Sequence, residues 1–157
     1  METISPWDEN IINLINRDLF CIIDPNKEHS HTIGMAKYGL PDLLISSKQL
    51  EGNSIILSVI AQDWIDNGLT LTDRNDFFQT QNEDAITLKF SVLNCEELMF
   101  TKGMEFYNKF PAFNQLKKPA LVQVLWPDPH GFYAMDKEYD KGYYQYYFRP
   151  ISQYHNH

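Results

Sequence analysis

Two histidines stand at a spacing that can bind a transition metal. His29 and His31 are two residues apart, so if both belong to the predicted strand their imidazoles would point to one face of a sheet. A zinc site needs further ligands, and the third candidate, His130, comes without an acidic or cysteine ligand set. We therefore predict no metal site, and expect His29 to lie in a loop and His31 to pack beside the sheet.

An apolar run breaks at Trp126 into the turn Pro127-Asp128-Pro129-His130-Gly131. The prolines lack a backbone donor and fix φ, while glycine accepts a positive φ, so the chain must leave the sheet sharply. Two interpretations stay open: Asp128 closes the turn with its side chain, or Trp126 and Asp128 line a pocket beyond the strand. Because aspartate is common in turns, we favour the first.

Gly34 follows Thr32 and Ile33 within a predicted strand. A glycine there marks a bulge or a place where another group approaches the backbone closely, and that group is either the Trp126 ring or a ligand. The most specific site hypothesis is a ligand pocket formed by His31, Thr32, Gly34, Trp126, Asp128 and Gly131.

No known catalytic motif accompanies these residues. The chain has no Gly-x-Ser-x-Gly elbow, no dinucleotide-binding glycine motif and no P-loop, so we predict no cofactor. Cys21 and Cys95 stand singly in hydrophobic segments, which indicates two reduced thiols. The carboxylates at Asp136, Glu138 and Asp140 are typical of a solvated loop. Whether the protein is an enzyme stays open, and the lack of a catalytic motif favours a protein that is not an enzyme.

Charge narrows the classes of partner. Thirteen Lys and Arg face 21 Asp and Glu, a formal charge of −8, and Lys117-Lys118 is the one adjacent basic pair. This balance opposes binding to nucleic acid and suits a basic protein partner. We predict no leader peptide and no membrane span, hence a cytoplasmic protein, and the sequence leaves its oligomeric state open.

Periodicity predicts the elements that would position the site. Ser5 caps a first helix, Ser46 or Ser47 caps the longest one, and the segment Thr70 to Asp84 shows little periodicity. The longest helix presents Leu50, Ile55, Ile56, Val59, Ile60 and Trp64 on a broad apolar face. We expect strands over 20–23, 30–37, 42–45, 85–93 and 120–126, and a further helix over 96–110.

The elements predict the fold. With 157 residues, 43% of them hydrophobic, the chain over 1–157 suits a single α+β domain. We expect a mixed, mainly antiparallel sheet of about five or six strands, covered by the helices that begin near Ser47 and Glu96. The run Ala120 to Trp126 predicts a central strand buried on both faces.

The end of the chain is rich in tyrosine. Seven of the nine tyrosines lie between Tyr133 and Tyr154. They either cover the core or form an exposed surface for a partner, and we favour the cover because monomers rarely leave so much aromatic area bare.

Two separated segments resemble a known family. Ser30-His31-Thr32-Ile33-Gly34-Met35 followed by Gly39-Leu40-Pro41-Asp42-Leu43-Leu44-Ile45, and Gln123-Val124-Leu125-Trp126-Pro127-Asp128 to Gly131 with Tyr139-Asp140, are similar to motifs of the bacterial domain of unknown function 4262. The resemblance spans about 22–150 and implies a small bacterial α+β domain with no established reaction. The chain departs from the family at His31, where an aromatic residue is usual, and at Ala134-Met135-Asp136, where the family often has Pro-Trp-Glu.

Two function hypotheses result. The first is a non-enzymatic binding or protein-interaction module, of the accessory or toxin-neutralising type, whose acidic or tyrosine-rich surface binds a protein partner. The alternative is a small enzyme, or a flavin- or nucleotide-binding protein, that uses a pocket at the strand end near Trp126. Convergence of His31, Trp126 and Asp128 on one concave site would distinguish them.

Overall fold

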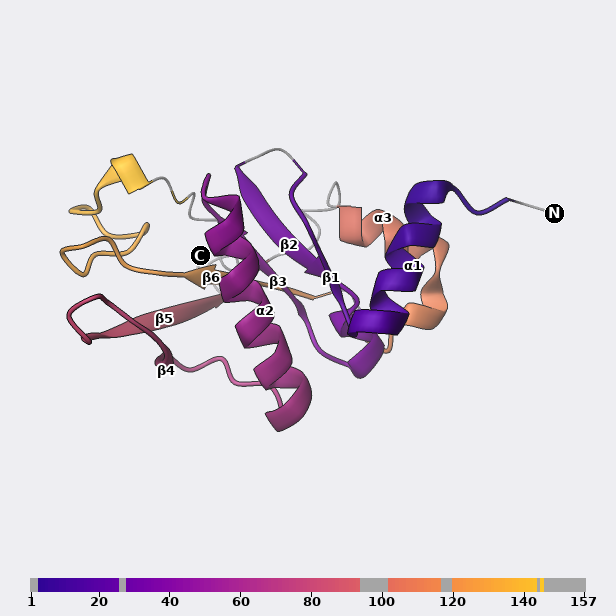
Figure 1. Ribbon diagram of the computed structural model, residues 1–157, viewed down its shortest axis with the longest axis horizontal. Helices are drawn as coiled ribbons and strands as arrows, with labels where there is room; N and C mark the ends of the chain where they lie inside the picture. The colour runs from indigo at the N-terminus through magenta and orange to yellow at the C-terminus, as the bar shows by residue number, and fades with distance from the viewer. Residues whose placement is uncertain (1–2, 26–27, 94–101, 117–119, 144, 146–157) are drawn as a thin grey trace, which may run out of the picture.

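The computed structural model describes residues 3–25, 28–93, 102–116, 120–143 and 145, which form three helices and six strands (Figure 1). The elements in chain order are α1 (Pro6–Asp18), β1 (Cys21–Ile23), β2 (His29–Ile33), β3 (Asp42–Ser46), α2 (Leu50–Asn67), β4 (Arg74–Gln79), β5 (Ala85–Val92), α3 (Lys102–Lys109) and β6 (Leu121–Leu125). Short 3-10 helices occupy Met35–Tyr38, Pro111–Phe113 and Lys141–Tyr143. None of the described helices is both long enough and apolar enough to cross a membrane.

The six strands form one sheet in the order β1-β2-β3-β6-β5-β4. The β3–β6 pair is parallel and the other four pairs are antiparallel, so the predicted mixed, mainly antiparallel sheet of a single α+β domain is confirmed. The short connections 24–28 and 34–41 join β1, β2 and β3 as antiparallel neighbours, as such connections usually do.

β6 lies inside the sheet between β3 and β5, as its apolar run predicts. All five of its residues are buried, and Val122 and Val124 are at most 1% exposed. Four of the five residues are apolar, and the fifth, Gln123, is buried as well, as expected for a strand covered on both faces, where alternate side chains point to opposite sides.

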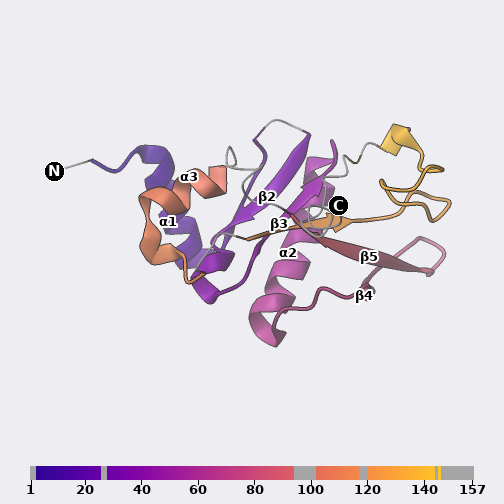
Figure 2. The same ribbon diagram turned by 180° about the vertical axis from the view of Figure 1, so that it is seen from behind.

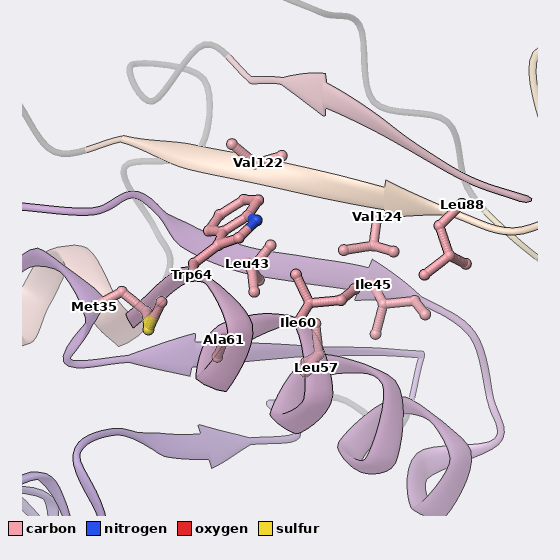
Figure 3. Packing of buried hydrophobic residues seen from close by; sticks show 10 residues of the cluster. All are labelled: Met35, Leu43, Ile45, Leu57, Ile60, Ala61, Trp64, Leu88, Val122 and Val124. Atoms are coloured by element: carbon pink, nitrogen blue, oxygen red, sulfur yellow. The ribbon is translucent and has the colours of Figure 1, made fainter. Parts of the chain in front are cut away.

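α2 crosses one face of the sheet and forms the main core with it (Figure 3). The helix buries Leu57, Ile60, Ala61 and Trp64, which meet the inward side chains of β3, β5 and β6. The predicted face was wrong in part, because Ile55 is 59% and Val59 37% exposed. Aliphatic residues encircle most of this helix, so its sequence does not single out one face.

α1 and α3 lie side by side at the far end of the molecule from the β4–β5 hairpin (Figures 1 and 2). Ser5 begins α1 as predicted, since its Oγ accepts the backbone N–H of Asp8 at 3.1 Å. A second cluster joins the two helices to the sheet: Ile11, Ile15, Cys21, Ile33, Ala36, Phe106 and Tyr107.

Three boundaries differ from the predicted ones. The strand expected over 30–37 ends at Ile33, because Gly34 takes φ 118° and the chain enters a 3-10 helix. The longest helix begins at Leu50 after Gln49, three residues beyond Ser47. Of the helix expected over 96–110, α3 forms the end, whereas residues 96–101 lie outside the described part of the chain.

β4 is a strand that periodicity does not predict. It is an edge strand with a register shift between Arg74 and Phe78, and its side chains are exposed or half-buried. Since only one edge of β4 is paired and neither face is deeply buried, the polar sequence carries little hydrophobic alternation. Pairing with β5 therefore decides its conformation more than its own composition does.

Candidate functional site

A pocket of about 600 Å³ opens where β6 ends. Its walls come from the β4–β5 hairpin, the second turn of α2 and the turn after β6; the hairpin and that turn extend together beyond α2 (Figures 1 and 2). We call it the strand-end pocket. Its described apolar wall comprises Ile56, Phe78, Ala85, Ile86, Leu88, Trp126, Pro127 and Pro129; its other described lining residues are Gln79, Thr80, Asp84, Asp128, Gly131 and Tyr143.

Trp126 is the first residue after β6 and forms part of this wall. Its backbone N–H donates to Gln145 Oε1 at 3.2 Å, and its carbonyl accepts the Gln145 Nε2 amide at 2.7 Å. This paired contact fixes the strand end. The half-buried indole packs against the main core, and its Nε1 donor is buried without a partner among the described residues.

Asp128 closes the turn. Its Oδ1 accepts the backbone N–H groups of His130 and Phe132, each at 2.9 Å, and its Oδ2 accepts that of Asp140 at 2.9 Å. Burial disfavours the charged form, but these three donors outweigh it and lower the pKa of Asp128. The structure thus gives the carboxylate the turn-closing role, and Gly131 supplies the positive φ of 86° that the same turn needs.

Thr32 and Gly34 have structural roles away from the strand-end pocket: Thr32 makes hydrogen bonds, and Gly34 allows close packing. Thr32 Oγ1 donates to Asp42 Oδ1 at 2.8 Å and accepts the Leu43 N–H at 2.9 Å. A Cβ on Gly34 would lie 3.0 Å from Ile15 Cγ1, in α1. The group that approaches Gly34 closely is therefore α1 and the residues that follow it, not the Trp126 ring.

His31 is 1% exposed and neutral. Burial chiefly lowers its pKa to about 4. Its Nδ1 hydrogen-bonds the Thr32 carbonyl at 3.0 Å, which makes Nδ1 the protonated nitrogen, and its Nε2 is buried without a partner among the described residues. The ring stacks on His29, 6.3 Å away, and both residues belong to β2, so the expected loop position of His29 was wrong.

The six residues of the predicted pocket therefore fall into two groups. Trp126, Asp128 and Gly131 line the strand-end pocket. Gly34 lies beside Asp42, which pairs with Leu121 at the start of β6, five residues before Trp126. At about 3.3 Å per residue Gly34 lies roughly 16 Å from Trp126 along the strands. His31 is level with Gln123 through Leu44, which places it two strand spacings (about 10 Å) across and three residues (about 10 Å) along from Trp126, and Thr32 is the next residue of β2. The two groups do not converge on one site.

Ser91 of β5 has a buried hydroxyl without a partner among the described residues, but it does not form a nucleophilic pair with His31. The register links them on one face of the sheet through Leu44 and Gln123, three strand spacings in all. At about 4.8 Å per spacing they stand roughly 14 Å apart, far beyond hydrogen-bond reach.

Within the described segments, no three His, Cys, Asp or Glu residues lie close enough to hold a metal ion. Cys21 is a buried free thiol, and Cys95 falls outside those segments.

Sequence reasoning predicted the elements that carry Ile86 and Ile56 but missed β4, the first strand of the hairpin. Phe78, Ile86 and Ile56 form much of the apolar wall, yet β4 was not predicted. A signal was present: the polar run Thr80 to Asp84 separates Phe77-Phe78 from an alternating strand, which is the pattern of a hairpin. The pairing of that hairpin with the end of β6, far along the chain, has no such local signal.

Comparisons with known proteins add no relative. No family model, no curated protein and no solved structure matches the chain. The resemblance to the domain of unknown function 4262 thus stays a prediction, and the functional argument depends on the geometry of the strand-end pocket.

Proposed function

We propose that the protein is a non-enzymatic binding module that holds the apolar group of a small molecule in the strand-end pocket. The observation that carries this proposal is the pocket itself, about 600 Å³ with a continuous apolar wall from β4, β5, α2 and Trp126. Small-molecule sites have volumes of about 300 to 1,000 Å³ and similar linings.

The chemistry of the wall supports binding over catalysis. Asp128, the most deeply buried carboxylate there, already accepts three backbone N–H groups. Thr80 Oγ1 accepts the Asp84 N–H at 3.2 Å and so belongs to the hairpin turn. Among the described lining residues we find no nucleophile beside a general base, the arrangement that group transfer requires.

The same wall argues against a flavin or nucleotide. A phosphate group needs Lys or Arg side chains, a helix N-terminus or a nest of N–H groups. The described lining residues include no Lys, Arg or His, and two of them are aspartates. This charge balance disfavours any anionic ligand.

A protein partner on the tyrosine-rich surface is the weaker candidate. Tyr133 and Tyr139 are each 8% exposed, and Tyr133 Oη donates to the Thr87 carbonyl at 2.6 Å. Tyr133 thus covers β5 and Tyr139 bonds to Gln145, which favours the cover interpretation for these two, whereas Tyr143 is 38% exposed. Tyr144, Tyr146, Tyr147 and Tyr154 lie outside the described residues. We also propose that the module is bacterial, as the family resemblance implies, and cytoplasmic.

A neutral fluorescent probe tests the proposal. N-Phenyl-1-naphthylamine, titrated into the protein, should gain fluorescence and saturate at one molecule per chain. Phe78→Ala, which removes a wall residue, should weaken this binding by roughly tenfold. Phe77→Ala is the matched control, because Phe77 is also half-buried in β4 but does not line the pocket. Equal binding by both variants and the parent chain would contradict the proposal.

A further inference from the structure

The strand-end pocket combines aromatic surface with uncompensated negative charge. Trp126, Phe78 and Tyr143 contribute rings to its lining, and Asp84 and Asp128 contribute the only charged groups among the described lining residues. No described Lys or Arg forms an ion pair with either carboxylate. Elsewhere on the molecule, by contrast, acidic side chains such as Asp63, Asp73 and Asp76 pair with Arg74 or Lys89.

The two carboxylates differ in what they can do. Asp128 is 4% exposed and is held ionised by three backbone donors, so it contributes a fixed negative charge to the lining of the pocket. Asp84 is exposed in the hairpin loop; its backbone N–H donates to Thr80 Oγ1, and its carboxylate accepts no hydrogen bond from a described residue. Asp84 is therefore the group that can meet a ligand directly.

Aromatic faces and carboxylates attract the same kind of ligand. A ring presents the negative face of its quadrupole to a cation, and a carboxylate adds a full charge. The net charge of −8 acts in the same direction at longer range. The apolar wall, in turn, requires that the ligand also carry a hydrophobic body.

We propose that the strand-end pocket selects small organic cations, in which an ammonium group is attached to an aromatic or aliphatic body. The body lies against Phe78, Ile86 and Trp126, and the ammonium group lies at the rim beside Asp84. This inference rests on the proposed function, since it names the ligand class of the same pocket.

A matched series of compounds tests the selection. 1-Naphthylmethylamine, 1-naphthylmethanol and 1-naphthylacetate share one ring system and differ in charge, so their affinities separate the charge contribution from burial of the ring. Calorimetry at about pH 8, where an ordinary histidine is neutral, and at about 150 mM salt limits the comparison to charges within about 8 Å. We expect the amine to bind roughly 3- to 30-fold more tightly than the alcohol, and the acetate most weakly.

Two variants assign the preference to the pocket. Asp84→Asn should lower the affinity for the amine and leave that for the alcohol unchanged. Glu83→Gln removes the same charge one residue away, on a side chain that does not line the pocket, and should keep most of the preference. Folding is not at risk in either variant, because both side chains are exposed.

The outcomes separate the two proposals. If the alcohol binds as tightly as the amine, the cation selection is wrong while the apolar pocket stands. If Glu83→Gln lowers the affinity for the amine as much as Asp84→Asn does, the preference comes from the overall field and the inference is also wrong. If none of the three compounds binds, the proposed function itself fails and the selection fails with it.

Discussion

At the scale of single residues, the structure decides between the two roles that the sequence allows for Asp128. Its sequence context allowed either a turn cap or a ligand contact. The structure directs three backbone N–H groups, from residues up to twelve positions away, onto its two oxygens. The contact with Asp140 is the part that the sequence could not indicate, because it depends on how the chain returns after Tyr139.

Asp128 yields the first prediction. Asp128→Asn keeps an oxygen for the N–H groups of His130 and Phe132 but turns an amide donor toward the Asp140 N–H. Asp128→Ala loses all three contacts. Thermal unfolding should therefore give the highest Tm for the parent chain, a lower one for Asn and the lowest for Ala. An alanine variant as stable as the parent would contradict the turn-closing role.

A second residue-scale feature is the buried network around Asp42, which is 5% exposed. Its Oδ1 accepts the Thr32 hydroxyl and the Met35 N–H, and its Oδ2 accepts the Tyr107 hydroxyl at 2.6 Å. Tyr107 Oη in turn accepts the Gly34 N–H at 2.7 Å. Two elements far apart in the chain, β3 and α3, are joined through this one carboxylate.

Removing the Tyr107 hydroxyl should destabilise the fold. Tyr107→Phe leaves the Gly34 N–H and Asp42 Oδ2 buried without this partner, at a cost of about 1 to 3 kcal/mol in the free energy of unfolding. Tyr38→Phe is the control, because the Tyr38 hydroxyl makes a single, less buried bond to the Leu19 carbonyl. Equal losses measured by urea unfolding would show that the network has no special role.

The same network predicts a dependence of stability on pH. Burial raises the pKa of Asp42 to about 7, although the hydroxyls of Tyr107 and Thr32 and the Met35 N–H act to lower it. The native chain then holds a proton between about pH 4 and 7 that the unfolded chain has released. The contribution of Asp42 to stability is full below about pH 4 and is lost as the pH rises to 7.

Urea unfolding at several pH values measures this contribution. The unfolding free energy of the parent chain minus that of Asp42→Asn should fall from about pH 4 to 7 and stay constant above that range. Cys21 and Tyr107 are the titratable neighbours, and both stay uncharged there because burial raises the pKa of Cys21 to about 12 and that of Tyr107 further still. A difference that does not vary with pH would mean that Asp42 is ionised throughout.

At the scale of elements, local patterns predicted most of what the structure contains. Ser5 began α1, and the apolar run of β6 placed that strand inside the sheet. Local patterns failed where tertiary contacts decide. β4 is a strand because β5 pairs with it, and α2 buries Leu57 rather than Ile55 because of where the sheet lies. Likewise, the sequence did not show that His31, Thr32 and Gly34 lie away from Trp126, because no local signal reveals which ends of two strands are adjacent.

α2 offers the corresponding test. Ile60 is fully buried in the main core, whereas Ile55 is 59% exposed on the same helix. Ile60→Ala should lower the free energy of unfolding by about 2 to 5 kcal/mol, and Ile55→Ala should change it by roughly 0.5 kcal/mol or less. Comparable losses would mean that α2 packs on a different face.

At the scale of the whole molecule, the protein has two ends with different properties. α1 and α3 lie at one end around a buried cluster, whereas the β4–β5 hairpin and the turn after β6 extend from the other (Figure 1). These two segments and α2 line the strand-end pocket. A rigid sheet that carries a pocket on its projecting connections is a common arrangement for a binding site. The proposed binding site therefore lies at the end of the molecule away from α1 and α3, beside the main core of α2 and the sheet.

The most direct test of this central claim is a methyl NMR titration with 1-naphthylmethanol, a neutral ligand. Ile56 and Ile86 line the strand-end pocket, and Ile11 and Ile15 lie in the cluster of α1 and α3, so isoleucine methyl groups report on both ends. The account predicts that the signals of Ile56 and Ile86 shift together to saturation with one Kd while those of Ile11 and Ile15 stay in place. Unchanged Ile56 and Ile86 signals at saturating ligand, or shifts centred on Ile11 and Ile15, would contradict it.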